Sequence, residues 1–383
     1  MPSSSTRRIV ELDFFRGLVL LVIVVDHIGG SILSRVTLHA YALCDAAEVF
    51  VFLGGFTTAT AWIALCARRT EAAARQRFLR RAVEIYRAFV VTALLMLLVS
   101  AVLLACNVDA PNLTIADLDR LTSAPAGALR DIVLLRRQPY LAGVLPMYAL
   151  FALAAPLALP LARTRPWRLL AASVALWAVA PHAAPLLPHA PDEQWDFNPL
   201  AWQLMFVLGV LARTQPVFDR VSAHRLGWIA SAAALATVAA AAWYRLDHSP
   251  LAFGGELKRH LAWFRIANLV GIAWLVAHVI RLGWATRVAR ALPLVCVVGR
   301  NGLPSFVAGA VISLVTDSVL YRYTDGYLNV PAGLVADAFA LGTLLAAAWL
   351  FDAGRAPAAL ALRPAPIRRD DGGGNDRPSG RNG

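Results

Sequence analysis

Apolar segments about as long as a bilayer is thick recur along most of the chain. A helix that crosses a membrane needs about 20 mostly apolar residues, and ten segments reach or approach that length. They run roughly over 14–34, 46–66, 86–106, 141–162, 167–187, 198–212, 226–244, 261–280, 300–321 and 331–352. Charged residues make up only 16% of the chain, against about 25% in a typical soluble domain. The sequence therefore predicts an all-α integral membrane protein with about ten transmembrane helices.

The apolar segments divide the chain into three parts. Residues 1–13 form a short cytoplasmic N-terminal segment, 14–355 a polytopic membrane domain and 356–383 a tail. The first apolar run contains Asp26 and His27, and no small-residue cleavage site follows it. We therefore interpret this run as a retained helix rather than a signal peptide. The tail is rich in Gly, Pro and charge, so it is predicted to be disordered.

The basic residues predict the orientation in the membrane. The net charge of +12 would suggest a nucleic-acid partner in a soluble protein. Here most basic residues lie in short segments between the apolar runs. With ten spans, one side of the membrane receives 24 of them and the other side 9. Because cytoplasmic loops carry the excess of Lys and Arg, we predict that both termini are cytoplasmic. The expected surroundings are a lipid bilayer, with no nucleic-acid partner.

The four cysteines give no sign of a disulfide framework or a metal site. Cys44, Cys66, Cys106 and Cys296 are scattered and form no C-x-x-C pair, so we predict that they are small core residues. The chain also lacks the internal repeat that marks many transporters.

The first apolar segment carries the most informative ionisable residues. Arg16 and His27 are eleven positions apart, which is about 20° from three full helical turns and about 16 Å along the axis. One face of the helix therefore presents a cation near one end and a titratable imidazole near the other. Histidine is well suited to accept and return a proton near neutral pH, although a helix-packing hydrogen bond would also explain it. Asp26 points about 100° away, so we expect it to orient a partner other than His27.

A pair of carboxylates begins the second apolar segment. Asp45 and Glu48 are three residues apart, so they share a helix face near the depth predicted for His27. At this depth they could hold the histidine tautomer or bind a sugar hydroxyl. The alternative is that they complement the positive N-terminal end of the helix dipole.

Arginines are concentrated after the second apolar segment. Seven of them fall between Arg68 and Arg87, more than orientation requires. Guanidinium groups bind phosphate in a bidentate manner, so this cluster suits a polyphosphate ligand; contact with anionic lipid is the alternative. The candidates for an arginine stripe are Arg77, Arg80, Arg81 and Arg87.

Two segments predicted to lie on the external side of the membrane have a composition that suits ligand binding. Residues 107–139 form the longest of them, and 188–197 combine acidic residues with Trp195 and Phe197. Carboxylates and aromatic rings commonly bind sugars, although Trp also marks ordinary membrane interfaces.

Several strings together resemble the OpgC family over about residues 8–355. The matching strings are Glu11-Leu-Asp-Phe-Phe-Arg16-Gly17, Asp26-His27, Asp45-Ala-Ala-Glu48-Val-Phe-Val-Phe-Leu-Gly54-Gly55, Val144-Leu-Pro-Met-Tyr148, Phe197-Asn-Pro-Leu-Ala-Trp-Gln-Leu204 with Gly209, and Arg265-Ile-Ala-Asn268. The resemblance implies a bacterial inner-membrane protein that succinylates osmoregulated periplasmic glucans, within the acyltransferase-3-like membrane acyltransferases. In that wider group, an Arg precedes a catalytic His by eleven positions, which Arg16 and His27 match. Basic cytoplasmic residues of the group engage acyl-coenzyme A, although Glu84 stands here where many relatives have Arg.

The leading hypothesis is a membrane O-acyltransferase that moves an acyl group, succinyl by resemblance, from acyl-coenzyme A to a carbohydrate hydroxyl. No permanently bound cofactor or metal is expected. The predicted catalytic residues are His27, Asp26, Asp45 and Glu48; the predicted acyl-coenzyme A ligands are Arg16, Arg77, Arg80, Arg81 and Arg87; the predicted acceptor ligands are Trp195, Asn198 and Arg265. A transporter or channel for a polyol or glucan is the main alternative, and a non-catalytic scaffold is a weaker one.

Overall fold

The computed structural model describes residues 9–361, except for 192, 226, 248–254, 325–326 and 328. The described residues form helices and no strand, which confirms the predicted all-α class. The longer helices are α1 (Val10–Asp26), α3 (Ala46–Arg68), α4 (Glu71–Ala105), α7 (Val144–Thr164), α8 (Pro166–Ala183), α9 (Pro199–Thr214), α11 (Gly227–Asp247), α13 (Trp263–Arg281), α16 (Gly302–Tyr323) and α17 (Val330–Ala361). The expected disordered tail lies mostly outside the described residues, although α17 continues past the predicted boundary at 356.

Eight of the described helices are long and apolar enough to cross a membrane. The other two at predicted span positions are shorter: α1 has 17 residues and α9 has 16. Helix α9 packs between α3, α7 and α8, and most of its side chains are buried. Its neighbours therefore shield it, and it does not need the length of a lipid-facing span.

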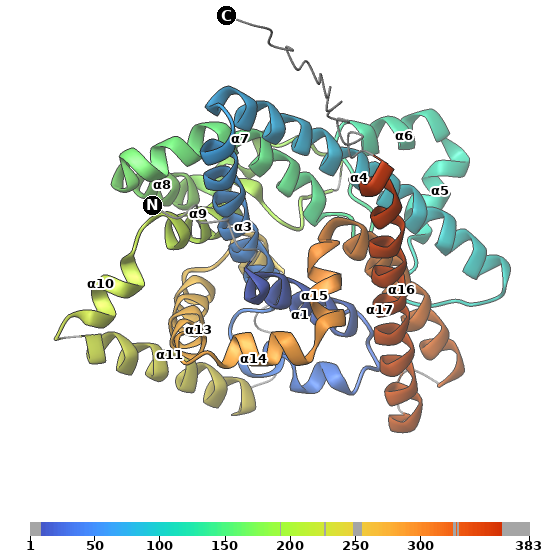
Figure 1. The fold of residues 1–383 in the computed structure, drawn as a ribbon. Helices are drawn as coiled ribbons and strands as arrows, with labels where there is room; N and C mark the ends of the chain where they lie inside the picture. The colour runs from blue at the N-terminus through green and yellow to red at the C-terminus, as the bar shows by residue number, and fades with distance from the viewer. Residues whose placement is uncertain are drawn as a thin grey trace, which may run out of the picture.

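Helix α1 lies near the middle of the bundle, as Figure 1 shows, and contacts α3, α14, α15, α16 and α17. Glycines let it approach α15 (Pro293–Arg300) closely: a Cβ on Gly17 would lie 1.9 Å from the Val295 carbonyl oxygen. Helices α3 and α9 meet in the same way, because a Cβ on Gly209 would lie 2.0 Å from the Phe52 carbonyl oxygen. Small residues at such crossings allow backbone contact between membrane helices.

The first helix ends earlier than the predicted 14–34. It spans Val10–Asp26, and His27 follows it as the C-terminal cap. The next backbone amides find acceptors on other helices: Gly29 N donates to Asp317 Oδ1 over 2.8 Å, and Ile32 N donates to Asp337 Oδ2 over 2.9 Å. Non-helical backbone at membrane depth requires such internal partners. The two carboxylates, on α16 and α17, therefore let the chain leave the helix immediately beside His27.

Helix α4 extends beyond the predicted third span, 86–106, at its N-terminal end. Helix α4 begins at Glu71, where the Thr70 hydroxyl caps it by accepting from Ala73 N, and it runs for 35 residues. The arginine-rich stretch belongs to this helix because Ala, Arg, Gln and Glu are good helix formers. At about 1.5 Å per residue the helix is about 52 Å long, which exceeds the ~30 Å hydrocarbon core. The helix is therefore longer than one crossing requires, and its first turns still pack on the bundle, because Ala74 and Phe78 are buried and the Phe78 ring centre lies 5.8 Å from that of Trp62.

Short helices fill the remaining connections. The stretch 289–299, which the sequence left ambiguous, falls in α14 (Trp284–Ala291) and α15 and does not form a span of its own. The segment 107–139 contains α5 (Ile115–Ser123) and α6 (Pro125–Val133). Arg137 joins this segment to 188–197, because it pairs with Asp117 and, over 2.7 Å, with Glu193. The two segments predicted to be external therefore form one connected surface.

Candidate active site

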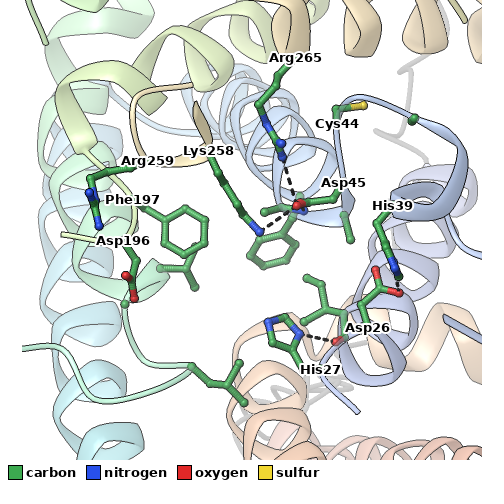
Figure 2. Close-up of a pocket in the computed structure, with 18 of the residues that line it drawn as sticks. Asp26, His27, His39, Cys44, Asp45, Asp196, Phe197, Lys258, Arg259 and Arg265 are labelled. Carbon is green, nitrogen blue, oxygen red and sulfur yellow. Dashed lines mark hydrogen bonds and ion pairs between the residues drawn. The ribbon is translucent and has the colours of Figure 1, made fainter. Parts of the chain in front are cut away.

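A cavity of about 510 Å³ opens between α1, α3, α7 and α13, and we call it the histidine cavity. Figure 2 shows His27 and Asp26 on one side of it, facing Asp45, Lys258 and Arg265. The C-terminal end of α1 and the N-terminal ends of α3, α7 and α13 line this cavity. Asp45, predicted to lie at the depth of His27, lines the same cavity as that histidine.

The environment of His27 fixes the position of its proton. Its Nδ1 lies 2.7 Å from the Ile23 carbonyl oxygen. A carbonyl oxygen only accepts hydrogen bonds, so Nδ1 carries the N–H and donates. In this tautomer Nε2 keeps its lone pair and is able to accept a proton. This hydrogen bond is within α1 and not between helices, and it leaves Nε2 free to accept a proton.

Asp26 serves a different partner, as its direction on the helix predicted. Its Oδ1 accepts from the Thr37 hydroxyl over 2.6 Å and lies 3.1 Å from His39 Nδ1. These contacts hold the segment after His27 against the end of α1. The carboxylate lines the histidine cavity, and its observed contacts position the cavity wall.

Asp45 and Glu48 begin α3 as a reciprocal cap. The Asp45 carboxylate accepts from Ala47 N over 2.8 Å, and Glu48 Oε2 accepts from Asp45 N over 2.9 Å. The dipole role that the sequence offered as an alternative is therefore present. Glu48 is 0% exposed and is not in the described lining of the cavity. Its prediction as a catalytic residue accordingly gains no direct support.

Two cations join these carboxylates into a buried network. Arg265 Nε donates to Glu48 Oε1, and Arg265 Nη2 donates to Asp45 Oδ2 over 3.1 Å. Lys258 Nζ lies 2.8 Å from the same Asp45 oxygen. Arg265, predicted as an acceptor ligand, lines the cavity, but these contacts are with protein carboxylates. Its observed role is to compensate buried negative charge.

Lys258 is the site residue that the sequence reasoning missed. It belongs to the short helix α12 (Glu256–Arg259), and its Nζ also lies 5.7 Å from the centre of the Phe197 ring. Burial lowers the pKa of its ammonium group, but the charges of Asp45 and Glu48 outweigh burial, so the pKa lies above its usual value. Lys258 is the chain's only lysine. That rarity was the available signal.

Trp195 and Asn198 lie outside the described lining of the histidine cavity. The indole N–H of Trp195 donates to the Pro188 carbonyl oxygen over 2.8 Å. Asn198 caps α9 by accepting from Leu200 N over 3.0 Å, and its Nδ2 donates to the Ala180 carbonyl oxygen. Both side chains are therefore committed to packing of the loop that carries Phe197. Their prediction as acceptor ligands gains no support from these positions.

A second cavity of about 250 Å³ lies further toward the N-terminal end of α1 and the C-terminal end of α3, and we call it the arginine cavity. Arg16, Arg77 and Arg81 line it, so the structure brings together three of the five arginines predicted to bind acyl-coenzyme A. The Arg16 guanidinium packs against Gly302, where a Cβ would lie 2.5 Å from Nη2. Arg80 and Arg87 are exposed and outside the described lining.

Glu84 organises the arginines that α4 contributes to this cavity. Its two oxygens lie 2.7 Å from Arg77 Nη1 and 3.0 Å from Arg81 Nη1. These pairs are largely exposed, with Arg77 at 51% and Arg81 at 37%, so they contribute little to stability. They are open to exchange for a more highly charged anion. Glu84 therefore places a carboxylate between two cations.

The two cavities adjoin along one face of α3. Most residues of α3 that line them recur every three or four positions, as one helix face requires, and the full set is Ala46, Ala47, Phe50, Gly54, Thr57, Thr58, Ala61 and Leu65. Phe50 and, from α16, Phe306 line both cavities. From Ala47 to Leu65 the helix rises about 27 Å, close to the ~30 Å thickness of a hydrocarbon core. The pair of cavities therefore extends across most of the bundle.

No group of three or more His, Cys, Asp or Glu side chains able to hold a metal ion occurs among the described residues. The arrangement is that of a multi-pass membrane protein with an imidazole cavity and an arginine cavity placed end to end. A family model described as OpgC protein matches residues 8–355. The chain therefore belongs to the OpgC family, and this membership implies an acyltransferase acting on periplasmic glucans. No curated protein and no solved structure matches the chain.

Proposed function

We propose that the protein transfers an acyl group, succinyl in the first instance, from acyl-coenzyme A to a hydroxyl of a periplasmic glucan at the bacterial inner membrane. The observation that supports this most directly is the pair of adjoining cavities, with His27 in one and Arg16, Arg77 and Arg81 in the other. Separate cavities suit a reaction whose two substrates come from opposite sides of a membrane. The choice of succinyl and of glucan rests on the family.

The donor occupies the arginine cavity in this proposal. Coenzyme A carries a diphosphate and a 3′-phosphate, and arginines bind phosphate through paired N–H donors. Arg77 and Arg81 would exchange Glu84 for these phosphates, while Arg16 binds deeper in the bundle. The pantetheine arm then extends along the α3 face and brings the thioester to His27.

The chemistry follows from the His27 tautomer. Nε2 removes the proton from a glucan hydroxyl as its oxygen attacks the thioester carbonyl carbon. The new C–O bond forms, the C–S bond breaks, and the coenzyme A thiolate receives the proton from the imidazolium. In this direct path Lys258, which lines the same cavity as His27, would stabilise the negative charge that develops on the oxygen of the reacting carbonyl. An acyl-enzyme intermediate on His27 would use the same groups in two steps.

The proposal is tested with purified protein in lipid nanodiscs, succinyl-coenzyme A and a periplasmic glucan fraction. Mass spectrometry should show succinyl increments on the glucan. His27→Ala should lower the rate by about 10² to 10⁴, the usual contribution of general acid–base catalysis, with the melting temperature unchanged. Near-normal transfer by the folded variant would refute the assigned base.

A transporter or channel for a polyol or glucan remains the second hypothesis, since two adjoining cavities would also form part of a transport path. Slow hydrolysis of succinyl-coenzyme A without acceptor distinguishes the two, because an acyltransferase leaks its acyl group to water. A transporter should show no such hydrolysis, but should move labelled glucan into proteoliposomes.

The orientation is part of the proposal, because the donor must come from the cytoplasm. In a variant whose four native cysteines are replaced by serine, Ser123→Cys should react with a thiol reagent that cannot cross the membrane, added from the periplasm. Ala72→Cys, at the start of α4, should be protected. Both positions are exposed, so the reagent can reach each of them from its own side of the membrane. The reverse labelling pattern would place the arginine cavity on the periplasmic side and refute the proposed orientation.

A further inference from the structure

Two aromatic side chains separate the cavities. Phe50 from α3 and Phe306 from α16 line both of them, and their rings stack with centres 6.0 Å apart and planes 18° from parallel. Between the described walls of the histidine cavity and of the arginine cavity, these are the residues in common. The passage from the arginines to His27 therefore crosses this pair.

The pair is supported from the side of the arginine cavity. The Tyr148 ring meets Phe50 edge-on with centres 5.2 Å apart, and its hydroxyl donates to the Phe50 carbonyl oxygen over 2.8 Å. Gly54 makes room for this ring, since a Cβ there would lie 2.7 Å from Tyr148 Cε1. Phe306 is buried and also lines a small pocket shared with His27. Phe50 is thus fixed by Tyr148, and Phe306 lines two pockets together with His27.

An acyl group held on a donor in the arginine cavity must pass these rings before its thioester reaches His27. Rings held in place by packing restrict the width of the acyl group that passes between them. They restrict its length much less, since a linear acyl chain keeps the same cross-section as it lengthens. The histidine cavity beyond them, at about 510 Å³, is much larger than a short acyl group. The restriction therefore lies in the passage and not in the cavity that receives the acyl group.

We propose that Phe50 and Phe306 form an aromatic barrier that sets the acyl specificity by admitting linear acyl groups and excluding branched ones. The inference rests on the proposed function and adds to it the class of donor: an acyl-coenzyme A unbranched beside its carbonyl carbon. The same barrier separates the contents of the two cavities when no donor is bound.

The test compares two donors of equal charge and chain length, succinyl-coenzyme A and 2,2-dimethylsuccinyl-coenzyme A. In the second donor the thioester is on the carboxyl next to the dimethyl carbon. The measured quantity is the ratio of kcat/KM for the branched donor to kcat/KM for the linear donor, so that intrinsic reactivity cancels between variants. Phe306→Ala should raise this ratio at least about tenfold, the size of discrimination expected from one or two methyl groups in a fitted apolar site. Phe50→Ala should raise it in the same direction.

Phe52→Ala is the matched control, because Phe52 lies two residues further along α3 and is not in the described lining of either cavity. It should leave the ratio unchanged. Phe306→Leu removes less volume and replaces Phe306→Ala if that variant does not fold. An unchanged ratio in the folded Phe50 and Phe306 variants would overturn the barrier while leaving the acyltransferase intact. Absence of succinyl transfer by the unaltered protein would overturn the proposed function and the barrier with it.

Discussion

Replacing Arg265 by Met separates a structural role of this arginine from binding of the acceptor. The change keeps an apolar stem but removes the charge that faces Glu48 and Asp45. Arg265 is 3% exposed and Glu48 is 0% exposed, so water cannot replace the lost partner. Removing one member of a buried pair costs about 3–5 kcal/mol, because the other charge stays buried and uncompensated.

The expected loss is measurable as a melting temperature in detergent. At about 2.1 cal/mol/K per residue, the unfolding entropy of a chain of 383 residues is about 0.8 kcal/mol/K, so we expect Arg265→Met to lower the melting temperature by about 4–6 °C. Adding Glu48→Gln to Arg265→Met should recover part of this loss, since the uncompensated carboxylate is then neutral. Arg281→Met is the control on the same helix: its pair with Asp219 is exposed on both sides, and such pairs contribute about 0–1 kcal/mol. If the effects of Arg265→Met and Glu48→Gln on stability were additive within about 0.5 kcal/mol, the coupling between the two side chains would be refuted. Arg265 would then again be a candidate acceptor ligand.

Three further predictions concern the donor, the packing and the loop beside the base. Arg77→Ala and Arg81→Ala should each raise the donor KM roughly tenfold with kcat held, whereas Arg80→Ala should not; equal effects in donor titrations of all three would remove the distinction drawn from the cavity lining. Gly209→Val should reduce the folded yield in size-exclusion chromatography, because its side chain would overlap the carbonyl of α3 that Gly209 touches; a normal yield would show that the helices can separate at low cost. Asp317→Ala leaves its three donors, at 2.6 to 2.8 Å, without their acceptor, so kcat should fall more than donor KM rises; an unaltered kcat would show that the loop keeps its place without the carboxylate.

Hydrophobic periodicity was sufficient to place the helices, but not their ends. Each predicted span has a helix at its position, since the need to satisfy backbone hydrogen bonds in lipid leaves few alternatives. The first span was predicted eight residues too long at its C-terminal end because residues 27–34 are apolar enough to continue it. The chain can leave the helix there because Asp317 and Asp337, which are 288 and 305 residues from their donors, accept hydrogen bonds from the backbone amides that follow. Hydropathy does not register such partners.

The site divides in the same way. The spacing of Arg16 and His27 on one helix face, and the two carboxylates that open α3, were legible in the sequence because they depend on local helical geometry alone. The face of α4 that packs toward α3 and α7 determines which arginines line the arginine cavity. This face carries Arg77 and Arg81, but not Arg80 or Arg87. Lys258, Phe50 and Phe306 come together only when α12, α3 and α16 are packed. The sequence by itself determined a helical membrane protein with Arg16 in its first helix and His27 at the end of that helix. The tertiary structure decided which cations share a cavity and what stands between the cavities, because those relations depend on contacts between helices that are distant in the chain.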